Sequence, residues 1–299
     1  MKPAKDRIEQ RGGWLFVTPA LLLIGVFFVI PVLGALLLSF TDFDIYSIGD
    51  VTNTRFIGLG NYRTLFTEPL FWTALRNTIY YVVVGGPLSV VVSLAAALLI
   101  NAKLVRWKPL FRSAFFAPWV TTLVAVALVW RYLYHPQYGL LNAFLGRLGL
   151  GPIDWLGNPH CAMPAIIVMS VWKNFGYNML IFLAGLQNIP PQLYEAAELD
   201  GAGAWQRFRN VTVPMLGPTF VFVGIVTMIA AFQIFSEPYV MTQGGPLKST
   251  LTLVLFMYEQ GFRWWRLGFA AAVAVVLGLL TLAGTALQLR LRRERAVTA

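Results

Sequence analysis

The chain has 299 residues, of which 58% are hydrophobic and 12% are charged, and its mean hydropathy is +0.67. Soluble domains carry roughly 25% charged residues, so this composition excludes an ordinary soluble protein and predicts that the lipid bilayer is the main solvent of the chain. The net charge of +10 comes from Lys and Arg residues scattered beside apolar runs, without a contiguous basic domain. That distribution argues against a nucleic-acid partner.

A basic segment opens the chain and precedes a long apolar run. We expect residues 1–12, which contain several Lys and Arg residues, to form a cytoplasmic tail. The apolar run lies within residues 13–40, and its length of about 26 residues exceeds the roughly 7–15-residue apolar core of a signal peptide. We therefore expect residues 13–40 to be retained as a first transmembrane helix.

Five further apolar runs follow a polar segment over residues 41–72, which we expect to form an external loop. Each run is long enough to cross a hydrocarbon core of roughly 30 Å as a helix. The sequence therefore predicts an all-α, polytopic membrane protein with six transmembrane helices, in which residues 73–291 form one transmembrane domain and residues 292–299 a cytoplasmic tail. The five runs cover residues 73–100, 111–133, 161–186, 211–236 and 267–291.

The distribution of Lys and Arg predicts the orientation in the membrane. With a cytoplasmic N-terminus, most of these residues fall on the cytoplasmic side, as the positive-inside rule requires. Counting the helix over residues 13–40 as the first run, the segment between the fourth run (161–186) and the fifth run (211–236) then faces the cytoplasm. On the outside we expect a loop that contains a short helix over residues 140–148, and a second loop over 237–266. The second loop carries aromatic residues of the kind that form interface belts, namely Phe256, Tyr258, Phe262, Trp264 and Trp265.

The chain lacks the sequence motifs of a catalyst. Metalloprotease, serine hydrolase and redox-cysteine motifs are absent, and the single cysteine gives neither a disulfide nor metal-ligand spacing. Residues 244–250 are superficially similar to a phosphate-binding loop, but Leu247 replaces the required glycine and Pro246 removes a backbone amide. We therefore expect no catalytic residue, no metal and no cofactor in this chain, so that any ATP is bound by another polypeptide.

The polar stretch between the fourth and fifth runs has the pattern of two short helices joined by a bend. Pro190 and Pro191 favour a helix start. Gly201 favours a left-handed turn, after which residues 202–208 form a second helix. Small alanines leave room for another protein to approach closely. The residues alone are equally compatible with a plain surface helix pair, and the expected cytoplasmic position favours the docking interpretation.

This stretch resembles the EAA loop of binding-protein-dependent ABC importers. The matching residues are Glu195, Ala196, Ala197, Asp200, Gly201, Ala202 and Pro214, with Val213 where the family usually has leucine. A "GLxNY"-like element over residues 57–62 and a T-x-G-G-P segment over 242–246 are similar to those of sugar permeases. The resemblance implies a type I ABC importer fold with a cytoplasmic coupling helix, in the cytoplasmic (inner) membrane of a bacterium or archaeon. It also implies the partners, which are a homologous second permease, two ATP-binding subunits, an external solute-binding protein and a sugar substrate.

The fourth apolar run carries a polar stripe near its centre. Lys173 and Tyr177 share a helical face, and Asn174 and Asn178 lie beside them. A lysine inside a span is expected to face protein or water. From the residues alone, the stripe is equally compatible with hydrogen bonding between helices and with contacts to a hydroxyl-rich solute.

The resemblance favours a solute path. Comparison with the larger membrane subunit of maltose-type importers implies contacts at Lys173, Asn174, Tyr177, Thr227, Ala230, Ala231 and Ile234, of which the last three lack polar groups, so we expect a different substrate or pose. Aromatic stacking on Trp172, Phe175 or Tyr177 suits a sugar ring. Asn178 and Gln233 complete the predicted path. Glu237 lies four residues beyond Gln233 and is interpreted either as a further polar contact or, at least equally well, as a solvated helix end.

Three other functions are weighed against sugar import. A glycerol-3-phosphate importer of the same family would use Lys173 to bind phosphate. An ion-coupled secondary carrier would more often show inverted repeats and broken helices. A membrane enzyme acting on a lipid-linked sugar would need paired carboxylates near the interface, and only Asp42 and Asp44 have that placement.

Overall fold

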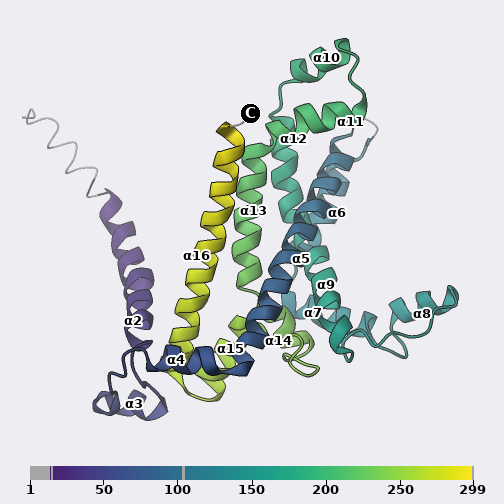
Figure 1. Ribbon diagram of the computed structural model, residues 1–299. Helices are drawn as coiled ribbons and strands as arrows, with labels where there is room; N and C mark the ends of the chain where they lie inside the picture. Colours follow the sequence, from purple (N-terminus) through teal and green to yellow (C-terminus); the bar gives the residue numbers. More distant parts are fainter. Residues whose placement is uncertain (1–13, 15, 103–104, 298–299) are drawn as a thin grey trace, which may run out of the picture. The chain divides into compact units, whose positions relative to one another are not determined.

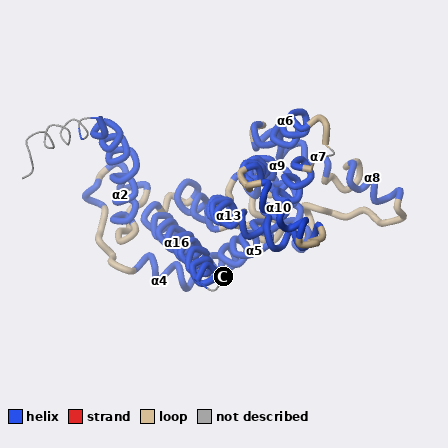
Figure 2. The backbone as a smooth tube through the Cα atoms, turned by 90° about the horizontal axis from the view of Figure 1, so that it is seen from above, coloured by secondary structure: helices blue, strands red, loops and turns tan. Residues whose placement is uncertain are grey.

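The computed structural model describes residues 14, 16–102 and 105–297. The predicted tail over residues 1–12 lies outside the described residues. The chain divides into two compact units, a smaller one within Met1–Glu68 and Met257–Val276, and a larger one formed by Pro69–Phe256 and Leu277–Ala299. Figure 2 shows helices and loops throughout the described residues, and the β pairing among them is an isolated bridge between Thr41 and Phe56. The predicted all-α class is therefore confirmed.

The smaller unit contains a long apolar helix and several short ones. The apolar helix runs over Phe16–Leu38 and includes a π-helical turn at its middle. Residues 41–68, predicted as loop, in fact contain three short helices, one of which begins where the Asp44 carboxylate accepts bonds from two backbone amides. Local capping of this kind was missed because the segment is polar overall. The elements are η1 (Gly25–Val29), α2 (Ile30–Leu38), α3 (Ile45–Gly49), η2 (Val51–Asn53), α4 (Gly60–Thr67) and η4 (Glu259–Arg263).

The larger unit is a helical bundle with α9 at its centre. Helix α9 packs against α5, α6 and α13, and Figure 1 shows α5, α9 and α13 side by side. The predicted short helix over residues 140–148 is present as α8. The elements are α5 (Pro69–Asn101), α6 (Lys108–Val120), α7 (Leu123–Leu133), α8 (Leu140–Arg147), α9 (Pro159–Gln187), α10 (Pro191–Leu199), α11 (Ala204–Arg207), η3 (Phe208–Thr212), α12 (Val213–Met215), α13 (Gly217–Phe232), α14 (Ser236–Met241), α15 (Leu253–Tyr258) and α16 (Leu267–Val297), the last two of which extend across the division between the units.

Two of the predicted spans are broken. Within the described residues, four helices are long and apolar enough to cross a membrane, and the number rises to six if each of two bent helix pairs is one span. Helices α6 and α7 meet at 96°, and the segment Ala204–Met215 meets α13 at 67°. The prediction of continuous helices over 111–133 and 211–236 was therefore wrong, because apolar composition does not report backbone breaks. Pro118 precedes the first break and Pro218 follows the second. Proline is expected near such breaks because it has no backbone N–H, which disrupts a helix interior but is tolerated in the first turn.

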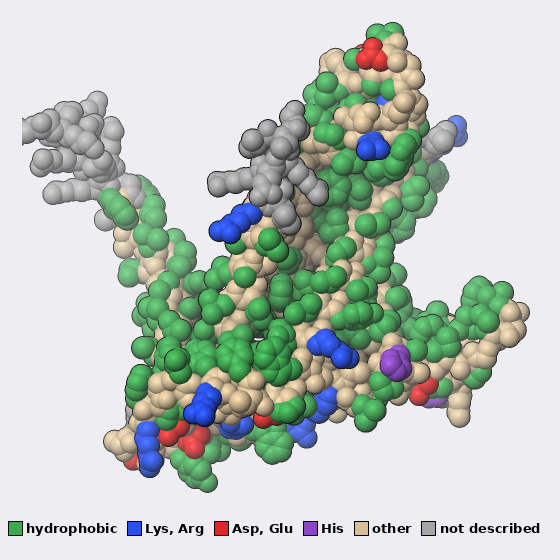
Figure 3. Space-filling model, viewed as in Figure 1, with side chains coloured by type: hydrophobic (Ala, Val, Ile, Leu, Met, Phe, Trp, Pro, Cys, Tyr) green, Lys and Arg blue, Asp and Glu red, His purple; other side chains and the backbone are tan. Residues whose placement is uncertain are grey.

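Close helix crossings in the larger unit depend on glycine. A Cβ atom at Gly176 of α9 would overlap the Phe115 carbonyl group of α6, so the two helices touch through backbone. A Cβ atom at Gly185 would likewise meet Thr219 of α13. Small residues allow this approach in membrane bundles, where packing replaces the hydrophobic driving force. Figure 3 shows hydrophobic side chains over much of the visible surface of the long helices, while acidic and basic side chains lie at the α10–α11 end of this unit.

Candidate functional site

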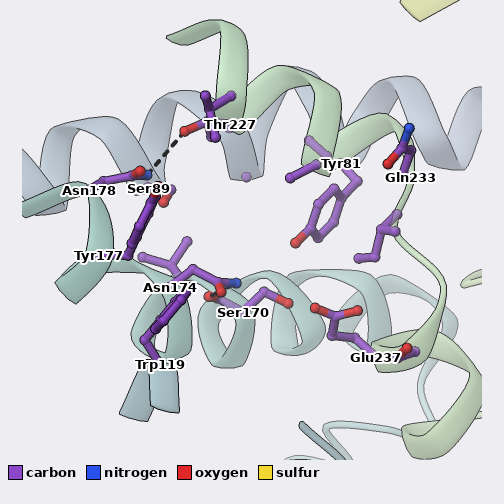
Figure 4. A pocket seen from close by; sticks show the side chains of 18 of the residues that line it. Tyr81, Ser89, Trp119, Ser170, Asn174, Tyr177, Asn178, Thr227, Gln233 and Glu237 are labelled. Atoms are coloured by element: carbon purple, nitrogen blue, oxygen red, sulfur yellow. Dashed lines mark hydrogen bonds between the residues drawn. The ribbon is translucent and has the colours of Figure 1, made fainter. Parts of the chain in front are cut away.

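A pocket of about 540 Å³ lies within the larger unit, between α5, α9 and α13. The end of α6 and the start of α14 complete its lining. This volume is in the range of small-molecule sites, roughly 300–1,000 Å³. Figure 4 shows the polar and aromatic side chains that face it, which are Tyr81, Ser89, Trp119, Ser170, Asn174, Tyr177, Asn178, Thr227, Gln233 and Glu237.

An aromatic pair forms one wall of the pocket. The rings of Trp119 and Tyr177 stack with centroids 4.9 Å apart and planes inclined by 15°. Trp119 reaches this position because α6 ends at Val120, immediately after it. Trp172 and Phe175, the other two aromatic residues predicted to stack on a sugar, instead pack against Trp130 and Phe115 and do not line the pocket.

Amide and hydroxyl groups lie beside the aromatic pair. The Asn178 side-chain amide donates a hydrogen bond to the Thr227 hydroxyl over 3.0 Å, which joins α9 to α13 (Figure 4). The Asn174 amide donates to the Ser170 carbonyl of its own helix, over 2.9 Å. The predicted polar stripe therefore includes a bond between helices and also faces the pocket, so the two interpretations are not exclusive.

Lys173 is buried and is not among the residues that line the pocket. Its ammonium lies 3.2 Å from the Trp119 carbonyl oxygen and 3.4 Å from that of Pro118. Both carbonyls belong to the last turn of α6, whose acceptors have no partner within the helix. Lys173 thus caps α6 at the 96° break. The geometry favours a helix contact for Lys173 over the predicted contact with solute.

The α14 end of the pocket carries Glu237 together with two polar residues that the sequence pattern did not single out. Tyr81 of α5 and Ser170 of α9 line it together with Glu237, whose side chain is only 9% exposed. This burial contradicts the interpretation of Glu237 as a solvated helix end and agrees with the alternative, a polar contact in the pocket. Burial raises the pKa of the Glu237 carboxyl, and the positive charge of Lys173 opposes that rise.

Of the two missed pocket residues, Tyr81 and Ser170, only Ser170 could have been predicted from its spacing in the sequence. Ser170 lies four residues before Asn174 and seven before Tyr177, so the helical period places it on the same face. Tyr81 gave no comparable signal because it comes from another helix. Ala230, Ala231 and Ile234 also line the pocket, as do Thr227 and Gln233 of the predicted path. Among the described residues, no cluster of three His, Cys, Asp or Glu side chains is placed to hold a metal ion.

The polar stretch between α9 and α13 forms the predicted bent helix pair. Helix α10 begins at Pro191, and Gly201 follows it with φ of +76°. The Gly201 amide bonds to the Glu198 carbonyl over 3.0 Å and the Ala202 amide to the Ala197 carbonyl over 2.9 Å. These two bonds constitute a Schellman turn, the C-terminal cap that favours glycine.

The surface of this helix pair is open. Leu199 is 91% exposed and Trp205 69% exposed, and Glu195 and Ala196 are exposed beside them. An ion pair between Glu198 and Arg207 joins α10 to α11. The segment therefore presents an ordered, partly apolar surface at one end of the larger unit (Figure 1).

The residues that follow the T-x-G-G-P segment are hydrogen-bonded to α5. The Asn77 side chain of α5 donates to the carbonyls of Lys248 and Leu251, and the Thr78 hydroxyl accepts from the Leu253 amide. Phe256, which we expected in an interface belt, is fully buried. The predicted external loop over 237–266 therefore contains buried structure, including α14 and α15.

Comparison with known proteins agrees with this architecture. Residues 89–296 match the family described as binding-protein-dependent transport system inner membrane component. The chain belongs to this family. The permease is 39% identical to the lactose transport system permease protein LacF of Rhizobium radiobacter, over 97% of this chain and 96% of that protein. It is 36% identical to the arabinooligosaccharides transport system permease protein AraP of Bacillus subtilis, over 95% of this chain and 89% of that protein.

The fold of the permease is also similar to that of a solved transporter. The match is to a chain of a bacterial ABC transporter involved in the import of the acidic polysaccharide alginate, with a TM-score of 0.80. It covers 97% of this chain and 98% of that chain at 21% sequence identity, so it bears on the fold alone. The family is a transport family and not an enzyme family, and the type I importer fold expected from the sequence is confirmed.

Proposed function

We propose that the permease forms, with a partner permease, the membrane path of an ATP-driven importer for a di- or oligosaccharide or a related polyol. The observation that carries the proposal is the pocket wall, where stacked aromatic rings lie next to amide and hydroxyl groups. Sugars have apolar ring faces and polar edges, which such a wall binds by stacking and hydrogen bonding. Asn174, Tyr177, Asn178, Thr227 and Gln233 are the residues we assign to the path.

The lining favours a sugar over glycerol 3-phosphate. The described residues that line the pocket include no Lys or Arg. The ammonium of Lys173 is engaged with the α6 carbonyls, so it is not available as a phosphate ligand without breaking that cap. Phosphate sites normally use Arg, Lys or backbone amides.

The α10–α11 segment supplies the coupling surface. We assign Glu195, Ala196, Ala197, Asp200, Gly201 and Ala202 to contact with an ATP-binding subunit, of which the importer has two. ATP binds to those subunits, and an external binding protein delivers the solute. In this proposal the segment and both termini face the cytoplasm, and movement of the docked segment alternates access to the pocket.

Uptake into proteoliposomes tests the proposal. The permease is co-expressed with its partner subunits, purified and reconstituted with ATP inside and binding protein outside. We expect a radiolabelled neutral disaccharide to accumulate only when both ATP and the binding protein are present. Solute-driven proton or sodium flux by the permease alone would instead identify an ion-coupled carrier.

Two variants connect the pocket to this uptake. Tyr177→Ala removes the stacking ring, and we expect it to raise the apparent KM for the sugar about tenfold, whereas Tyr177→Phe retains the ring and should change KM much less. Asn174→Ala should likewise weaken uptake without preventing assembly, which size-exclusion chromatography monitors. Unchanged kinetics in both alanine variants would assign the polar stripe to helix packing.

A further inference from the structure

The α14 end of the pocket brings together three buried polar side chains from three helices. Tyr81 lies on α5, Ser170 on α9 and Glu237 on α14 (Figure 4). Their exposed fractions are 8%, 2% and 9%. Buried polar groups normally have hydrogen-bond partners within the protein, so a group without one in a cavity wall needs a reason.

Ser170 lacks such a partner. Its hydroxyl oxygen is fully buried and makes no hydrogen bond with a described residue. The Tyr81 phenol is its neighbour, but the two hydroxyls do not form a bond of ordinary geometry. Ser170 lines the pocket, so rotation about its χ1 angle would bring the covered hydroxyl within reach of a solute there.

Glu237 is the only carboxylate among the described lining residues, and it has no ion-pair partner in the described part of the chain. The nearest basic group that acts on it is Lys173, whose ammonium contacts the carbonyls of Pro118 and Trp119. Lys173 therefore influences Glu237 through its charge and not through a salt bridge. Tyr81, on α5, is the other titratable group beside it and is neutral in its phenol form.

We propose that Glu237 and Ser170 form a subsite that binds hydroxyl groups of an uncharged glycan and rejects glycans that carry a carboxylate or sulfonate. This inference rests on the function proposed above and names the class of its substrate. The carboxylate accepts hydrogen bonds from sugar hydroxyls, and the serine hydroxyl both donates and accepts. An anionic substituent would lie near a like charge in a lining without Arg or Lys, which disfavours its binding.

Direct binding to the solubilised importer, without the external binding protein, tests the subsite. Equilibrium dialysis compares lactose with its aldonate lactobionate, and maltose with maltobionate, from neutral to alkaline pH, because burial raises the pKa of the Glu237 carboxyl and the repulsion requires its ionised form. For the wild type we expect the neutral member of at least one pair to bind about tenfold or more tightly than the aldonate.

Variants separate charge from hydrogen bonding. Glu237→Gln keeps hydrogen-bonding atoms and removes the charge, so we expect the preference for the neutral sugar to fall to within about twofold. Glu237→Asp keeps the charge and should keep the preference. Ser170→Ala should weaken binding of the neutral sugar about two- to tenfold while the preference remains. Asp154→Asn removes an exposed carboxylate outside the pocket and is the control, with no change in either value expected.

Each outcome decides a separate question. If no neutral disaccharide binds the wild type, the proposed sugar function fails and the subsite fails with it. If neutral sugars bind but their aldonates bind equally well, or if Glu237→Gln leaves the preference intact, the sugar function stands and the subsite is overturned. The thermal midpoint of each variant complex shows that it is folded. If Glu237→Gln is unstable, Ser170→Ala still tests the hydroxyl contact, and the wild-type preference should fall as the pH decreases and the Glu237 carboxylate takes up a proton; a preference that does not change with pH overturns the role of the charge.

Discussion

The pocket and the α10–α11 segment are two candidate functional regions of the same unit, and they are built in different ways. The segment is held by contacts between residues close in sequence, such as the Schellman turn at Gly201 and the ion pair between Glu198 and Arg207. The pocket is held by contacts between distant residues, such as Asn178 with Thr227 and Trp119 with Tyr177. A local turn keeps its shape by itself, whereas the pocket exists only while several helices stay packed.

This difference predicts how each region fails. Substitutions in the segment should alter coupling and leave the bundle stable, because the segment buries little surface. Substitutions at the helix crossings around the pocket should lower stability and solute binding together, because the same contacts support both. The variants below test that distinction.

The largest effect is expected for Gly176→Ala. The added Cβ would overlap the Phe115 carbonyl and force α6 away from α9. Because Trp119 lies on α6 and Tyr177 on α9, this movement would separate the two stacked rings of the pocket wall. Overpacking of this kind costs about 1–3 kcal/mol. We expect a lower thermal midpoint of the solubilised importer and loss of sugar binding.

A second glycine in the larger unit provides the control. Gly278 of α16 has no atom within 4 Å of an added Cβ, so Gly278→Ala should leave the thermal midpoint unchanged or raise it through better helix propensity. If Gly176→Ala is as stable as Gly278→Ala and binds sugar normally, the close crossing does not support the pocket.

Gly201→Val is expected to have the next largest effect. No atom lies within 4 Å of an added Cβ here, so the penalty comes only from φ of +76°, a conformation that a β-branched residue avoids. We expect uptake in proteoliposomes to fall about tenfold or more while ATP hydrolysis and the thermal midpoint persist. Gly201→Asn tolerates positive φ and should retain most uptake. Equal uptake by both variants would mean that the turn conformation is not needed for coupling.

The sequence predicted the local region better than the pocket. Pro191 and Gly201 are readable as helix start and helix end because capping depends on neighbouring residues. The breaks after Val120 and at Leu216 were missed because the apolar runs continue across them. Without those breaks the composition of the pocket cannot be deduced. Trp119 lines the pocket only because α6 ends beside it.

Glu237 and Lys173 show the same limit. The sequence left two interpretations open for each residue: Glu237 as a polar contact or a solvated helix end, and Lys173 as a solute contact or a helix contact. The structure buries the first in the pocket and turns the second toward α6. A side chain on a helix face can point along several directions, and packing against a distant helix selects one of them.

A smaller effect is expected for Lys173→Met. Methionine preserves apolar bulk but leaves the carbonyls of Pro118 and Trp119 without their charged donor. Hydrogen bonds to a charged group contribute about 1.5–3 kcal/mol, so we expect a lower thermal midpoint, which Lys173→Arg should partly restore. Because the same contact holds Trp119 in the pocket wall, the affinity for sugar should fall together with the thermal midpoint, and Lys173→Arg should partly restore both. A tenfold loss of affinity at unchanged stability would instead make Lys173 a solute ligand.

The smallest effect is expected at the ion pair that joins α10 to α11. The Glu198 side chain is 60% exposed and that of Arg207 28% exposed, so water screens the pair and its contribution is about 0.2–1 kcal/mol. We expect Glu198→Gln to leave uptake within about twofold of the wild type, because the Schellman turn still holds the bend. Since the Gly201 amide bonds to the backbone carbonyl of Glu198, this side-chain change does not remove the cap. If Glu198→Gln abolishes uptake as strongly as Gly201→Val, the carboxylate itself contacts the ATP-binding subunit, and a charge reversal at Arg207 would then have little effect.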